Sequence, residues 1–207
     1  MPAHSKIILA ALAAIPLAAC TSAYTGPIEV TRFVAADTAP LGQGPITLYF
    51  PDEIGNSSAR AAFADAVADE LGRLGYTVVM QEGAGIQVAT VRTSRGNIES
   101  ADRRRGPVSV GVGGSRGTYG GGLGVGLGIN LGGDRGPVFV TDLSVRIVDD
   151  AQRTLWEGRA ELPTSAKSPY ADIDRSANAL AAALFKDFPG GNGETVQVSV
   201  DELERTP

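Results

Sequence analysis

The sequence predicts an α+β domain: one mainly antiparallel sheet with two helices packed on one face, plus a Gly-rich β-hairpin insertion. Segments with alternating apolar and polar residues predict strands, and two segments with apolar residues at three- and four-residue spacing predict helices. Most neighbouring strand segments are joined by short turn sequences, which is typical of hairpins. Strands and helices mixed in this way indicate an α+β domain.

The first elements lie close to the N-terminus. PIEVTRFV, residues 27–34, alternates like a strand, and ITLYF, residues 46–50, predicts a second strand. A helix is expected over residues 59–74, because Ser57 or Ser58 can cap its start and Gly75 can end it. The apolar face of this helix contains Phe63, Val67, Leu71 and Leu74.

The middle and the end of the chain add further strands and a second helix. YTVVM (76–80) and GIQVATVRT (85–93) are rich in β-branched residues, and VFVTDLSVRIVDD (138–150) and TLWEGRAEL (154–162) are joined by a turn sequence. A helix is expected over residues 172–187, ended by Pro189, Gly190 and Gly191. A last strand is marked by Val196, Val198 and Val200.

The Gly-rich insertion covers residues 106–136 and contains 14 glycines. Two alternating arms around a Gly-rich turn predict a β-hairpin. In its second arm, five glycines (Gly122, Gly124, Gly126, Gly128 and Gly132) cost about 3 to 5 kcal/mol in total in a strand. The five apolar side chains of that arm (Leu123, Val125, Leu127, Ile129 and Leu131) contribute about 1.5 to 3 kcal/mol each when buried. The hairpin is therefore ordered only if its apolar side is covered by the domain itself, by a partner or second copy, or by lipid.

The N-terminus is typical of an exported protein. Lys6 is the only charged residue before Glu29, and residues 7–17 are almost entirely Ile, Leu and Ala. This pattern matches a secretory signal and is too short to span a bilayer. LAAC, residues 17–20, resembles the lipobox of bacterial lipoproteins, a family in which the cysteine is lipidated and the signal is cut immediately before it. We expect residues 1–19 to be the signal peptide and Cys20 to carry the lipid.

A lipid on Cys20 makes the membrane the first expected partner. Cys20 is the only cysteine of the chain, so it has no internal disulfide partner. An ordinary signal peptide with a chance cysteine is the alternative. Two or more acyl chains make attachment stable. Thr21 stands where many lipoproteins retained in the inner membrane have Asp, so we expect the outer membrane, on its periplasmic side. Residues 20–26 would be a tether reaching roughly 20 to 25 Å, followed by one domain over residues 27–204.

Several segments together resemble one family. They are GPIEVTRF, LGRLGYTVV, SVGVGGSRGTYGGGLGVGLG, TDLSVRIVD, LWEGRAEL and ALFKDFPGGNGETV. This combination resembles the bacterial lipoprotein family called domain of unknown function 4136, and the resemblance covers nearly the whole mature chain. It implies an envelope location and an α+β fold. It implies no activity, and no functional residue is carried over from it.

Catalytic and metal-binding groups are scarce in the mature chain. His4 leaves with the signal, so neither histidine nor a free thiol remains. Ser115 lies in a pattern that matches a nucleophile elbow, but no base of the usual kind is present to activate it. Zinc sites built from His and Cys are excluded. We therefore expect no catalytic residue, no metal site and no cofactor.

Other candidate residues have simpler structural interpretations. Asp149 and Asp150 are adjacent carboxylates, but a hairpin turn explains them better than a calcium site. Thr164 and Lys167 have the spacing of a hydroxyl and lysine pair, but nothing in their polar loop would desolvate the amine. Trp156 is expected to be partly in the core. The glycines match no phosphate-binding pattern, and acidic residues outnumber basic ones, so no nucleotide or nucleic acid is expected.

Charge and anchoring together suggest a binding role. The mature chain has a net charge of −6, but residues 92–136 have +4. The expected function is a non-enzymatic binding or scaffolding module of the cell envelope. Its partner would be an envelope protein or a second copy, contacted through the Gly-rich insertion and the exposed sheet. The alternative is a carboxylate-based hydrolase of a cell-wall glycan, which needs two carboxyls about 5 to 10 Å apart across a cleft. A purely structural spacer is a third possibility.

Overall fold

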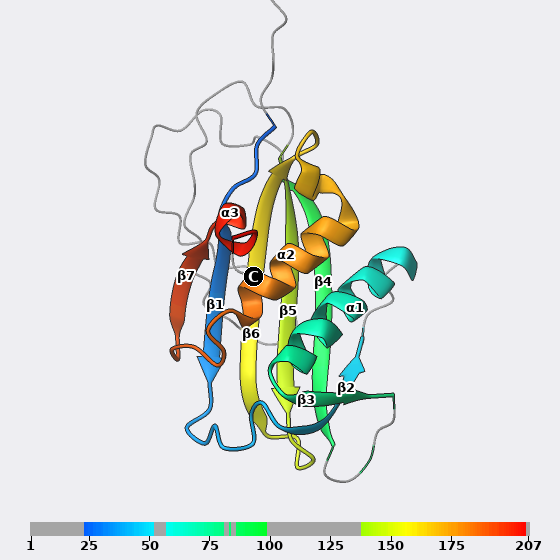
Figure 1. The fold of residues 1–207 in the computed structure, drawn as a ribbon, viewed down its shortest axis with the longest axis vertical. Coiled ribbons are helices and arrows are strands. Elements are labelled where there is room, and N and C mark those ends of the chain that lie inside the picture. Colours follow the sequence, from blue (N-terminus) through cyan, green and yellow to red (C-terminus); the bar gives the residue numbers. More distant parts are fainter. Residues whose placement is uncertain (1–22, 52–56, 81–82, 84–85, 99–137, 206–207) are drawn as a thin grey trace, which may run out of the picture.

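The computed structural model describes residues 23–51, 57–80, 83, 86–98 and 138–205. Within these residues, the helices lie on one face of a single seven-stranded sheet (Figure 1). The strands are β1 (Ile28–Val34), β2 (Gly44–Tyr49), β3 (Tyr76–Val79), β4 (Gln87–Ile98), β5 (Val138–Val148), β6 (Thr154–Ser165) and β7 (Glu194–Val198). The helices are α1 (Ser57–Arg73), the 3₁₀ helix η1 (Pro169–Ala171), α2 (Ile173–Phe185) and α3 (Val200–Leu203).

The sheet is mixed, so the prediction of a mainly antiparallel sheet with two packed helices is wrong. The strand order is β3-β2-β4-β5-β6-β1-β7. β2 pairs in parallel with both β3 and β4, whereas the remaining neighbours pair antiparallel. α1 connects β2 to β3, and a helical crossover of this kind returns the chain so that the next strand runs in the same direction. The strand-helix-strand order over residues 44–79 is the signal for this parallel pairing.

The C-terminus also differs from the expected last strand. β7 ends at Val198, and Val200 begins α3. Ser199 occupies the N-cap position, and Asp201 and Glu202 lie in the first turn. Carboxylates are favourable at a helix N-terminus because the helix dipole is positive there. The Ser199 side chain makes no capping hydrogen bond, so the first-turn carboxylates are the local feature that favours helix over the alternation of valines. The described chain thus has a third α-helix.

The hydrophobic core lies between the sheet and the helices. Trp156 in β6 is fully buried, and its ring stacks on Phe185 of α2 with centroids 5.3 Å apart. Its Nε1 donates a hydrogen bond to the Pro189 carbonyl at 2.9 Å. A Cβ at Gly158 would collide with the Trp156 ring and lie 2.8 Å from the Leu184 side chain. The glycine thus allows α2 to pack closely on β6.

A buried arginine connects β1 to the C-terminal end of α2. The Arg32 side chain donates from Nε to the Leu184 carbonyl and from Nη2 to the Ala183 carbonyl, both at 3.0 Å. The last carbonyls of a helix have no partner within the helix, so these bonds satisfy groups that would otherwise be buried and unpaired. Burial lowers the pKa of Arg32, and the nearby carboxylates of Asp187 and Glu194 oppose this shift.

Candidate functional site

The side of the sheet opposite the helices forms the candidate site. Successive strand residues point to opposite faces, so Trp156, Gly158 and Ala160 of β6 face the helices and the residues between them face away. No helix of the described chain lies on this second side (Figure 1). We call it the helix-free face. Its central residues are Glu29, Thr31, Phe33, Tyr49, Thr90, Asp142, Ser144, Arg146, Glu157, Arg159 and Glu161.

One row of this face combines aromatic and charged side chains. The strand registers place Tyr49, Thr90, Arg146, Glu157 and Phe33 side by side across five strands, and we call them the aromatic row. Phe33 is 56% exposed and Tyr49 is 49% exposed. Between them, Arg146 Nε donates to Glu157 Oε2 at 3.0 Å. The row therefore presents two apolar rings with an ion pair between them.

A second row is acidic. Asp142, Glu161 and Glu29 are in register on three adjacent strands, and we call them the acidic row. Arg159 donates from Nε to Asp142 at 3.0 Å, and its Nη2 lies 3.0 Å from Glu161 Oε1. Burial raises the pKa of Glu161, as do the carboxylates of Asp142 and Glu29, while Arg159 lowers it. One guanidinium thus holds two of these carboxylates on the surface of the sheet.

A shallow depression lies beside the aromatic row, close to the β5–β6 turn. Its volume is about 330 Å³. Among the described residues, its lining combines an aromatic ring, a guanidinium, hydroxyls and an amide, and it contains no carboxylate. The lining residues are Tyr49, Val88, Thr90, Arg146, Val148, Gln152 and Thr154.

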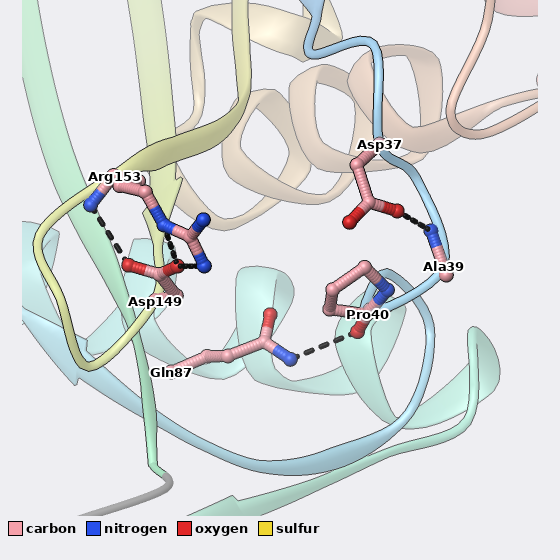
Figure 2. Close-up of polar contacts among 6 residues, drawn as sticks. All are labelled: Asp37, Ala39, Pro40, Gln87, Asp149 and Arg153. Atoms are coloured by element: carbon pink, nitrogen blue, oxygen red, sulfur yellow. Dashed lines mark hydrogen bonds and ion pairs between the residues drawn. The ribbon is translucent and has the colours of Figure 1, made fainter.

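Hydrogen bonds hold the β5–β6 turn beside this depression, and a separate hydrogen bond connects β4 to the loop after β1 (Figure 2). Asp149 accepts hydrogen bonds from the backbone N–H of Arg153 at 2.8 Å and from its Nε at 2.7 Å. The backbone bond from Arg153 lowers the pKa of Asp149, against the opposing effect of burial. This clamp closes the turn that contains Gln152, whose φ is 62°. Gln87 donates to the Pro40 carbonyl at 2.9 Å and ties the loop after β1 to β4.

The opposite end of the sheet holds the N-terminal segment of the described chain. Tyr24 N donates to Ser165 Oγ at 2.9 Å, and Ser165 N donates to the Tyr24 carbonyl at 2.8 Å. Gly26 N donates to the Pro163 carbonyl at 2.8 Å. Part of the expected tether, from Tyr24 onward, is therefore bonded to the end of β6.

Several residues singled out from the sequence lie outside the described residues. These are Cys20 with the signal segment 1–19, Ser115, and the Gly-rich insertion over residues 106–136. Among the described residues, no group of three His, Cys, Asp or Glu side chains is placed to hold a metal ion. In the same part of the chain, no helix has both the length and the apolar character needed to cross a bilayer.

The remaining candidates take structural positions. Asp149 forms the turn clamp, and Asp150 is exposed beside it. Trp156 is fully buried, deeper than the partly buried position expected from its charged neighbours. Thr164 is buried whereas Lys167 is exposed, so the two are not presented together to solvent.

Sequence reasoning did not single out Phe33 and Tyr49. An aromatic residue in an apolar strand segment usually predicts core. The available signal is parity: Phe33 alternates with Glu29 and Thr31, whereas Ile28 and Val30 are the buried positions of β1. Two-residue periodicity places Phe33 on the polar side of its strand.

Comparison with known proteins gives distant similarity to solved structures and a match to one family. The solved structures with distant similarity include the following two. A PDZ domain protein from Parabacteroides distasonis is 15% identical with a TM-score of 0.47, over 84% of this chain and 38% of that chain. The PelC dodecamer from Paraburkholderia phytofirmans is 12% identical with a TM-score of 0.36, over 76% of this chain and 94% of that chain. The chain thus spans well under half the length of the first of these proteins. No curated protein matches it. Residues 43–190, more than half of the sequence, match the family described as a domain of unknown function, DUF4136, and the chain belongs to that family.

Proposed function

We propose that this chain is a lipid-anchored, non-enzymatic binding module of the bacterial cell envelope. Cys20 would attach it to the outer membrane on the periplasmic side. The aromatic row of the helix-free face would contact an envelope protein. The observation that carries this proposal is the pair of exposed aromatic rings, Phe33 and Tyr49, aligned on either side of the Arg146–Glu157 ion pair.

The aromatic row has the composition of a protein contact surface. Within the described chain, the exposed large hydrophobic residues are Phe33, Tyr49 and Met80, and two of these lie in this row. Interfaces are enriched in aromatic residues and Arg, and covering an aromatic ring removes apolar surface from water. Four strand-to-strand steps of about 4.8 Å make the row roughly 19 Å wide. This width is sufficient for a side-chain cluster at the centre of a protein interface.

The arrangement of carboxylates favours binding over hydrolysis. Glycoside hydrolysis needs two carboxyls that face each other across a cleft and leave room for substrate. Asp142 and Glu161 instead lie side by side on adjacent strands and share Arg159. The described lining of the depression has no carboxylate. For these reasons we propose the binding module and not the glycan hydrolase.

Site-specific photo-crosslinking in intact cells tests the contact surface. A photoreactive amino acid is placed at Phe33, at Tyr49 or at Met80, which is 100% exposed and lies outside the row. We expect a discrete protein adduct from the first two positions and none from Met80. An adduct of twice the chain mass would identify a second copy as the partner. Equal yields at all three positions, or no adduct at Phe33 and Tyr49, contradict the proposal.

A matched double variant tests whether the rings contribute to binding. Phe33→Ser with Tyr49→Ser should reduce by about ten-fold the adduct formed from a crosslinker at Ser144, since both anchors of the contact are lost. Met80→Ser is the control and should leave the yield unchanged. Circular dichroism should show that both the double variant and the control are folded, because each changed side chain is about half exposed or more.

The anchor has a separate test. The intact mass of the native protein should correspond to a chain that begins at Cys20 and carries added acyl groups. Cys20→Ser should abolish the lipidated form and release the protein from membranes. If the variant yields a mature form of the same size that remains in the membrane fraction, the lipid anchor is wrong.

A further inference from the structure

We infer that the protein stands upright on the bilayer, with the end of the sheet around Tyr24, Ser165 and Lys167 against phospholipid headgroups. The β5–β6 turn and the depression would then face the periplasm. This inference rests on the proposed lipidation of Cys20. It adds which end of the sheet contacts the lipid and how the helix-free face is oriented relative to the membrane.

The tether is shorter than the sequence alone indicates. Because Tyr24 is bonded to Ser165, only Thr21, Ser22 and Ala23 separate it from Cys20. Four residue steps span at most about 14 Å. A lipid on Cys20 would therefore hold the end of β6 close to the headgroups.

The same end is shared by several strands. Ser165 is in register with Val138, and Val138 is in register with Ile98. β5 then runs 11 residues to the far end, which is roughly 33 Å of strand. The tether is less than half this length. The β5–β6 turn can therefore reach lipid only if the molecule lies flat.

Charge opposes both flat orientations. Lying on the helix-free face would bring four carboxylates (Glu29, Asp142, Glu157 and Glu161) and three arginines (Arg92, Arg146 and Arg159) toward the anionic lipids of a bacterial membrane, a net charge of −1. Lying on the helices would bring three acidic residues of α1 (Asp65, Asp69 and Glu70) and two arginines (Arg60 and Arg73), again a net charge of −1. Each flat orientation therefore places a net negative face against anionic lipid, which the upright orientation avoids.

The end of the sheet around Tyr24, Ser165 and Lys167 is a more favourable lipid-facing surface than either flat face. Arg95 and Lys167 are exposed there, and the Arg95 guanidinium lies 5.6 Å from the centroid of the Phe139 ring. Basic side chains near a bilayer are attracted to anionic headgroups. Asp172 and Asp174 are also exposed at this end, together with Arg175, and Asp172 accepts a hydrogen bond from Arg175 N at 3.1 Å as the cap of α2.

Labelling from the membrane tests the orientation. The acylated mature product, which begins at Cys20, is reconstituted in vesicles of phosphatidylethanolamine and phosphatidylglycerol. The vesicles contain a trace of phospholipid with an amine-reactive ester on its headgroup. The mature chain has only two lysines, Lys167 and Lys186. Ala151→Lys adds an amine at the exposed β5–β6 turn. Peptide mass spectrometry then compares the sites, each normalised to its labelling by a soluble ester.

We expect normalised labelling of Lys167 to exceed that of the Ala151→Lys site by about ten-fold or more, because proximity raises the effective concentration of the lipid ester. Similar labelling at both sites indicates a flat orientation and overturns the inference. Stronger labelling at position 151 indicates an inverted one and also overturns it.

A second arm separates orientation from natural lipidation. The chain from residue 20 onward is coupled through the Cys20 thiol to a maleimide phospholipid in the same vesicles, and the lysines are compared again. If the native product carries no lipid, the proposed anchor fails. The coupled chain still decides whether this short attachment places Lys167 against the headgroups. Equal labelling in the coupled arm rejects the upright orientation whatever the native mass.

Discussion

The two faces of the sheet use the same strands for different purposes, and β5 shows the contrast most directly. Leu143, Val145 and Ile147 are completely buried under the helices. Arg146, which lies between two of them, is 46% exposed on the other side. Because neighbouring residues have opposite environments, substitutions on the helix side should reduce stability. Substitutions on the helix-free face should affect binding and leave the fold intact.

The largest loss of stability is expected from Trp156→Ala. This change removes the stacking on Phe185, the hydrogen bond to the Pro189 carbonyl and the largest fully buried side chain. Large-to-small changes of a buried aromatic cost about 3 to 5 kcal/mol. Urea denaturation of the purified domain measures the difference in free energy of unfolding.

Phe33→Ala is the matched control on the opposite face. It removes an aromatic side chain that is 56% exposed, from a strand that pairs with β6. The expected change is within about 1 kcal/mol. A loss from Phe33→Ala as large as that from Trp156→Ala would contradict the division of the sheet into a structural face and a binding face.

A smaller but substantial loss is expected from Arg32→Met. The variant leaves the Leu184 and Ala183 carbonyls of α2 without their donors. An unsatisfied buried hydrogen-bonding group costs about 1 to 3 kcal/mol, so the two carbonyls together would cost about 2 to 6 kcal/mol. Removing the desolvated guanidinium offsets part of this cost, and the net loss should lie near 2 to 4 kcal/mol. Denaturant unfolding gives the magnitude, and hydrogen exchange should show faster exchange in the last turn of α2.

Arg32→Lys sharpens this prediction. A lysine keeps the charge but cannot reproduce the planar pair of donors that reaches two carbonyls. We expect it to recover at most part of the lost stability. Full recovery would mean that charge, and not the geometry of the guanidinium, stabilises the junction between β1 and α2.

The helices of this fold could be predicted from the sequence, but the pairing of its strands could not. The periodicity in residues 59–74 and 172–187 predicts both long helices, because each apolar face is a local pattern. The family resemblance is confirmed by the match over residues 43–190. The mixed sheet was missed because pairing depends on the crossover through α1, and the expectation assumed that neighbouring strands form hairpins.

The candidate site is less accessible from sequence. Alternation alone places Glu157, Arg159 and Glu161 on one side of β6. It cannot show that Phe33 lies opposite Glu157, since these residues are more than a hundred positions apart and their register is set by tertiary structure. Lipidation of Cys20 and a binding role for the Gly-rich insertion remain predictions, because both lie outside the described residues.

The stability contributed by the β5–β6 turn, which borders the depression, should depend on pH. The Arg153 backbone N–H holds the pKa of Asp149 below its ordinary value of 3.8. A carboxylate with a lowered pKa contributes stability that is fully present above the unfolded-state pKa. This contribution is lost as pH falls through the lower folded-state value. We expect Asp149→Asn to be less stable than the wild type at neutral pH. The difference should shrink once the pH falls below about 4.

Denaturation curves of both proteins across the acidic range measure this difference. A gap in stability that is constant down to the lowest pH would show that the carboxylate charge is not what stabilises the turn. Asp150→Asn, at the exposed neighbouring position, is the control for the loss of one negative charge from the turn.

The smallest effect, with the opposite sign, is expected from Glu161→Gln on the acidic row. Burial raises the pKa of Glu161 above its ordinary value of 4.5. The folded protein therefore holds this proton more tightly than the unfolded chain. The stability of the folded protein therefore decreases as pH rises through the pKa of Glu161 in the unfolded chain and then through its higher pKa in the folded protein. The variant should equal or slightly exceed the wild type at neutral pH, and this advantage should vanish in acid. The difference should stay below about 1 kcal/mol, because the side chain is 41% exposed and solvent screens its charge.

Opposite pH slopes for Asp149 and Glu161 would distinguish the two carboxylates by their surroundings. Asp149 accepts hydrogen bonds that stabilise its charge, whereas the charge of Glu161 is disfavoured first by burial and then by two neighbouring carboxylates. A cationic partner that covers the acidic row would reverse the preference of Glu161 and lower its pKa. The pH dependence of Glu161→Gln should therefore weaken when such a partner is bound. If the slope is the same with and without the crosslinked partner, the partner does not reach the acidic row, and its contact is confined to the aromatic row.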